Sequence, residues 1–165
     1  MLDQLLKLVE QNAGDAIVKN QAIPNQFNNA AVKEVASHIF NGLQGQVAQG
    51  NMQQVVSMFK GQSASSLANN PMVSNMINQV AGSFAQKFGV SPQVAQGIAA
   101  NLLPQVMNQF VTKTNDPSDN DFDLQNMMRS FSGNQSLDVG SIIGKVAGGK
   151  SGGIGDVLAN LFGGK

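Results

Sequence analysis

The sequence predicts an all-α protein: an irregular array of helices around a central helix kinked by proline, followed by a glycine-rich C-terminal tail. Three observations support this prediction. Apolar residues recur at the three- and four-residue spacing of amphipathic helices through most of residues 1–113. Two of these runs begin at Asn-Pro or Ser-Pro, and three stop at a glycine, which are helix start and stop signals. Finally, 42% of the 165 residues are hydrophobic, which is enough for a real core.

Three helices are expected in the first 61 residues. The first ends at Gly14, and its apolar face holds Leu2, Leu5, Leu6 and Val9. The second begins near Asn28 or Asn29, because asparagine is a good N-cap residue. The third follows Gly50 and ends at Gly61. These three helices form the first half of a helical core domain that we predict over residues 1–113.

The next two helices have the clearest boundaries. Asn-Pro at 70–71 opens one helix, Gly89 stops it, and Ser-Pro at 91–92 opens the next. In that last helix apolar pairs recur every four residues, so the apolar stripe drifts by about 40° per repeat and winds around the helix. Pro104 lies in its middle, removes a backbone hydrogen bond to residue 100 and predicts a kink. We therefore expect a bent, central core helix.

The chain changes character after residue 113. Residues 114–121 are predicted to form an acidic loop, and residues 122–131 a short amphipathic helix that docks on the core. Residues 132–165 form a glycine-rich tail with two copies of a short amphipathic repeat, too few for a solenoid. The apolar residues of the repeat are candidate contacts for a partner: Ile142, Ile143, Val146, Val157, Leu158, Leu161 and Phe162.

The sequence is poor in reactive side chains. It has no Cys, Trp or Tyr and one His, ten basic residues balance ten acidic ones, and it contains eighteen Asn and eighteen Gln. Because catalysis needs nucleophiles, titratable groups or metal ligands gathered in one place, we predict no enzyme activity, no cofactor and no metal, and no small-molecule substrate is evident. The leading hypothesis is a protein-interaction or self-assembly module, in which uncharged helical faces and the C-terminal repeat bind a protein partner or a second copy.

The location follows by elimination. The N-terminus lacks the basic region and long apolar run of a secretory signal, and no stretch approaches about 18 consecutive apolar residues. We therefore expect a cytoplasmic protein.

Two other functions stay open. Residues 84–98 resemble a helix-turn-helix, in which Lys87, Gln93 and Gln96 would contact DNA. Affinity for DNA depends on contacts from Lys or Arg to phosphate, and the second helix has neither before Lys113, so nucleic acid is less favoured. The repeat in residues 139–165 could instead lie on a membrane surface, although its polar face is weak.

Three further patterns favour structural interpretations. Residues 144–151 match the phosphate-loop pattern, but they lie inside the glycine-rich repeat and too few residues follow to complete a nucleotide-binding sheet. Asp119, Asp121 and Asp123 alternate as in a calcium loop, but the required glycine and glutamate are missing. His38 has no second ligand near it in sequence, so we expect a structural or surface histidine.

The segment from about residue 82 to residue 110 resembles the YidB-like family of bacterial proteins of unknown function. The residues that carry the resemblance are Phe88-Gly89-Val90-Ser91-Pro92, Ala95, Ile98-Ala99, Leu102-Leu103-Pro104 and Val106-Met107. The resemblance implies an all-α, cytoplasmic bacterial protein with no established activity, and it provides no catalytic residues.

Overall fold

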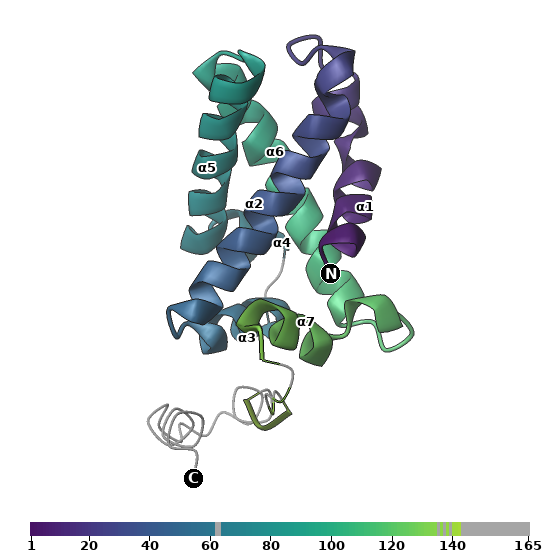
Figure 1. The fold of residues 1–165 in the computed structure, drawn as a ribbon, viewed down its shortest axis with the longest axis vertical. Coiled ribbons are helices and arrows are strands. Elements are labelled where there is room, and N and C mark those ends of the chain that lie inside the picture. Colours follow the sequence, from purple (N-terminus) through teal and green to yellow (C-terminus); the bar gives the residue numbers. More distant parts are fainter. Residues whose placement is uncertain (62–63, 135, 137, 139, 143–165) are drawn as a thin grey trace.

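The computed structural model describes residues 1–61, 64–134, 136, 138 and 140–142 (Figure 1). These residues are largely helical and contain no strand, which confirms the all-α prediction. The α-helices are α1 (Leu2–Ala13), α2 (Asn28–Ala48), α3 (Met52–Gly61), α4 (Ala64–Ala68), α5 (Pro71–Phe88), α6 (Pro92–Thr114) and α7 (Leu124–Ser132). A π-turn covers Gly14–Val18, and single 3-10 turns cover Asn25–Phe27 and Asn120–Phe122.

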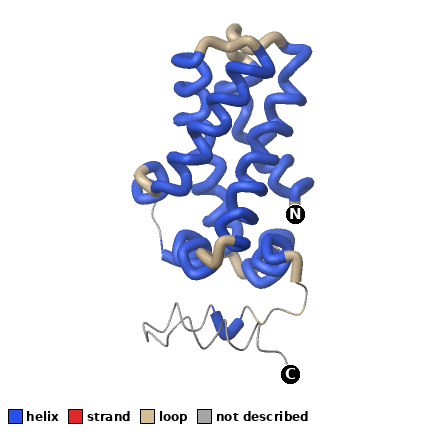
Figure 2. Tube along the Cα trace, turned by 60° about the vertical axis from the view of Figure 1, so that its left-hand side comes forward, coloured by secondary structure: helices blue, strands red, loops and turns tan. Residues whose placement is uncertain are grey.

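The four long helices enclose the core. α1 packs against α2 and α6, and α5 packs against the same two helices, so the four close into a ring. α3 and α7 lie across one end of this ring (Figures 1 and 2). No helix within the described part of the chain is long and apolar enough to cross a membrane.

α6 is the central helix, as the four-residue spacing predicts. It contacts α1, α3, α4 and α5, and its buried residues are Ala95, Ile98, Ala99, Leu102, Leu103, Val106, Met107, Phe110 and Val111. The helix is continuous through Pro104. Because proline has no N–H, the Ala100 carbonyl lacks its usual hydrogen bond from residue 104, but Ala100 is exposed, so water can reach it. The expected bend at Pro104 stays a prediction.

The predicted caps of α5 and α6 are confirmed. The Asn70 side chain accepts a hydrogen bond from the Met72 N–H at 2.9 Å, and Ser91 Oγ accepts one from the Val94 N–H at 3.4 Å. Between the two helices Gly89 has a φ of +66°, a left-handed conformation that costs glycine little. These local signals define the tight hairpin that α5 and α6 form.

Near the N-terminus the expected helix boundaries are confirmed, but two local details differ. α1 ends at Ala13 with Gly14 as its C-cap, yet a π-turn follows directly, and the Lys19 N–H donates to the Gly14 carbonyl at 2.9 Å. Gly14 keeps a right-handed φ of −51°, so it does not act as a left-handed terminator here. α2 begins at Asn28, as expected, but neither Asn28 nor Asn29 caps it; Phe27 holds the cap position, because a 3-10 turn leads directly into the helix. The short helix α4 was not among the helices expected from the sequence.

The acidic loop and α7 use aspartates as caps. Asp119 accepts a hydrogen bond from the Asp121 N–H at 3.2 Å, and Asp123 accepts one from the Asn126 N–H at 3.0 Å. The apolar side chains that follow the loop are buried in the same cluster as those of α2 and α6, and they are Phe122, Leu124, Met127, Met128 and Phe131.

Phenylalanine rings join the elements at this end of the molecule. Phe110 on α6 meets Phe59 on α3 edge to face, with centroids 5.0 Å apart, and meets Phe122 at 5.6 Å. Phe131 on α7 packs on Phe40 of α2 at 5.5 Å. Such pairs add to the free energy gained from burying each ring.

Candidate interaction surface

Most of the predicted contacts of the C-terminal repeat lie outside the described residues; these are Ile143, Val146, Val157, Leu158, Leu161 and Phe162. The remaining one, Ile142, is 6% exposed and belongs to the core cluster. The phosphate-loop pattern at 144–151 also lies outside the described residues.

The helix-turn-helix residues do not form a basic surface. Lys87 Nζ lies 2.8 Å from both carboxylate oxygens of Glu34, and Gln96 Nε2 donates to Asn78 Oδ1 at 3.3 Å, whereas Gln93 is exposed. The second cation of this hairpin, Lys113, pairs with a carboxylate of the acidic loop at 3.2 Å. Both lysines of residues 71–114 are therefore already neutralised, which leaves little charge for DNA phosphates.

Glu34 is the centre of a polar cluster between α2 and α5. His38 Nε2 lies 3.0 Å from Glu34 Oε1, Lys87 donates to both oxygens at 2.8 Å, and Ser83 Oγ also donates to Oε1. The spacing of Glu34 and His38 on one helix was visible in the sequence, but the participation of Ser83, on another helix, was not. Burial raises the pKa of Glu34, but the hydrogen bonds from Lys87 and Ser83 and the charges of Lys87 and His38 outweigh it, so the pKa is lowered.

The geometry of this cluster is structural and not catalytic. A serine nucleophile needs a base within hydrogen-bond reach, and here both Ser83 and His38 are turned to the carboxylate instead of to each other. Across the described residues, no group of three His, Cys, Asp or Glu side chains could hold a metal ion. We therefore interpret Glu34 as a clamp between α2 and α5.

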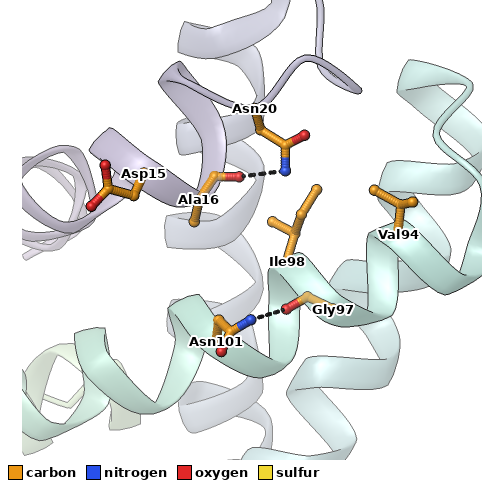
Figure 3. Close-up of a pocket in the computed structure, with 7 residues that line it drawn as sticks. All are labelled: Asp15, Ala16, Asn20, Val94, Gly97, Ile98 and Asn101. Carbon is orange, nitrogen blue, oxygen red and sulfur yellow. Dashed lines mark hydrogen bonds between the residues drawn. The ribbon is translucent and has the colours of Figure 1, made fainter.

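One hollow of about 340 Å³ lies between the π-turn and the first half of α6 (Figure 3). Its polar side chains already have partners within the protein. Asn20 donates to the Ala16 carbonyl at 3.2 Å, Asn101 donates to the Gly97 carbonyl at 2.9 Å, and Asp15 accepts from Lys19 at 2.8 Å. This hollow therefore has few free donors for a ligand.

A second surface, between α2, α3 and α5, differs in that most of its polar side chains have no partner in the described part of the protein. Two adjoining hollows of about 460 and 250 Å³ share Gln46, Met72 and Asn75. We call them together the amide groove, because most of the lining side chains are carboxamides: Asn41, Gln46, Gln49, Gln53, Gln54, Asn70, Asn75 and Gln79. The remaining lining residues are Gly42, Gly45, Ser57, Pro71, Met72 and Met76, so among the described residues no charged side chain lines the groove.

Six of these carboxamides make no side-chain hydrogen bond to any described part of the chain. They are Asn41, Gln49, Gln53, Gln54, Asn75 and Gln79. Gln46 and Asn70 are used within the fold, since Gln46 Oε1 accepts from Asn51 and Asn70 caps α5. Each free carboxamide offers two N–H donors and a carbonyl acceptor to a partner.

Two glycines from α2 line the groove, and their surroundings differ. A Cβ added at Gly42 would lie 2.9 Å from Met76 Cε, so a side chain there would require the Met76 side chain to shift. A Cβ added at Gly45 would meet no atom within 4 Å. Glycine in a helix interior costs about 0.5–1 kcal/mol relative to alanine. In the last turn of α2, Gly45 is therefore a less stable choice than alanine, and no contact within the described part of the chain explains it.

The sequence predicts uncharged polar helix faces, but not which face is hollow. Between Glu34 and Lys113 the chain carries only two charged residues, Lys60 and Lys87, and this signal marks the region of the groove. The hollow itself depends on how α2 and α5 lie side by side (Figure 1).

No family model, no curated protein and no solved structure matches this chain.

Proposed function

We propose that this protein is a non-enzymatic interaction protein that binds polypeptide through the amide groove. The observation that carries the proposal is the set of six free carboxamides around a charge-free hollow. Every peptide group presents one N–H donor and one carbonyl acceptor, and a carboxamide complements both. A polypeptide therefore matches the lining of the groove in chemistry.

Other partners fit the groove less well. Nucleic acid and anionic membranes are bound through Lys and Arg, and the residues that line the groove include neither. The C-terminal repeat would add apolar contacts to a polypeptide partner. A cytoplasmic location and the resemblance to the YidB-like family accord with the proposal and stay predictions.

The chain has no cysteine, so a photoreactive probe can be attached at a single introduced one. We would place a benzophenone on Asn75→Cys, in the groove, and as a matched control on Gln105→Cys, an exposed residue of α6 that does not line it. After illumination in an extract of the expressing cells, adducts of protein size are expected at position 75 and not at position 105. Adding Gln79→Lys to the probe variant is expected to abolish them.

Two outcomes would contradict the proposal. Equal adducts at both positions would mean that contact is unspecific, and the absence of adducts at position 75 would mean that the groove binds no polypeptide.

A further inference from the structure

We infer that the polypeptide bound by the amide groove is a second copy of this chain, docked through the same face. The inference rests on the proposed function and names its partner. In a two-fold interface residue i of one copy contacts residue j of the other and j contacts i, so the same surface must be complementary to itself. A carboxamide is both donor and acceptor, and the groove with its free carboxamides meets this condition.

Charge supports the same partner. A two-fold contact places the same face against itself, which opposes association when that face carries an excess of one sign of charge. The residues that line the groove carry none, and the whole chain has ten basic and ten acidic residues. Two copies therefore approach each other through this face without repulsion.

Gly45 indicates how closely the copies approach. It lies in the last turn of the 21-residue helix α2, lines the groove, and has no described atom within 4 Å of the place where a Cβ would be. Packed helices are held apart by the side chains at the contact, and a glycine lets the backbone of a neighbour come nearer. A second copy of α2 lying across the groove would occupy that space, and this accounts for a residue that the isolated fold does not require.

The test uses the purified full chain in sedimentation equilibrium and light scattering over a range of concentrations. A reversible dimer is expected. Gly45→Lys places bulk and a positive charge in the groove and is expected to raise the dimer Kd more than tenfold, because like charges meet at the contact. The matched control is Gly97→Lys, at another helical glycine with open space around its Cβ but outside the groove, and its Kd is expected to stay within about twofold of wild type.

A second variant keeps the test valid if Gly45→Lys fails to fold, which circular dichroism would reveal. Asn75→Lys changes an exposed residue of the groove and is expected to weaken the dimer in the same way. A dimer that both groove variants leave intact, or that Gly97→Lys weakens equally, would overturn the inference.

The remaining outcomes separate this inference from the proposed function. A chain that is monomeric at every concentration, but forms adducts with a different protein at position 75, overturns the second copy as partner and leaves the proposed function standing. A monomer that also forms no adducts refutes both.

Discussion

Alanine substitutions at the two glycines of α2 should change stability differently: Gly45→Ala should stabilise the protein and Gly42→Ala should not. Alanine is favoured over glycine in a helix interior by about 0.5–1 kcal/mol, and at Gly45 the added methyl group meets no atom within 4 Å. Gly45→Ala should therefore stabilise the monomer by nearly the whole of that amount. At Gly42 the methyl group would lie 2.9 Å from Met76 Cε and 3.1 Å from its Cγ, so Met76 must move. Overpacking of this kind costs about 1–3 kcal/mol, so Gly42→Ala should be neutral or destabilising.

The assay is thermal unfolding followed by circular dichroism. It must be made at a concentration at which the chain is monomeric, because association raises the apparent stability. For a protein of this size 1 kcal/mol moves the Tm by about 2–4 °C, so Gly45→Ala should raise the Tm by about 1–4 °C. A lower Tm for Gly45→Ala would show that the space at Gly45 is not open. Equal increases for the two variants would show that Met76 does not oppose a methyl group at Gly42, and either result would refute the reasoning.

Three further predictions concern the core, the clamp and the hairpin. Phe110→Ala removes a fully buried ring with two edge-to-face partners and should lower the free energy of unfolding by about 3–5 kcal/mol in urea titrations; a loss under 1 kcal/mol would contradict this packing. Because the fold lowers the pKa of Glu34, its stabilising effect is present above its unfolded pKa of about 4.3 and is lost as the pH falls through the folded value. The stability difference between wild type and Glu34→Gln should therefore be larger at pH 7 than at pH 3, and a difference that does not change with pH would exclude the carboxylate as its source. Gly89→Ala forces alanine to a φ of +66° and should cost about 1–2 kcal/mol, visible as a lower Tm; an unchanged Tm would mean that the hairpin tolerates another turn.

The features that were predictable from the sequence are those set by near neighbours in the chain. Asn70 and Ser91 cap helices through bonds to residues two and three positions away, so their role is visible in a short window. The burial of α6 follows from its four-residue apolar spacing for the same reason. The π-turn at Gly14 was not predicted, because glycine adopts either sign of φ readily and its presence does not show whether a helical path continues.

The candidate surface was predictable only in its composition. Whether a given carboxamide is free depends on residues distant in the sequence. Gln96 on α6 bonds Asn78 on α5, whereas Asn75, one turn earlier on α5, has no such partner within the described chain. The contact of Ser83 with Glu34 joins residues 49 positions apart and has no local signal either. The sequence therefore predicts an uncharged polar face but not the position of the groove.

The contact between α7 and α2 has a consequence for biosynthesis. Phe40 emerges from the ribosome early, whereas the ring that covers it, Phe131, is made only after all of the other long helices. Until then one end of the nascent bundle exposes apolar side chains to solvent, where chaperones can bind them or the chains can aggregate. Translation that stalls before Phe122 should leave this end uncovered, so the yield of folded protein should depend on how promptly the ribosome completes α7.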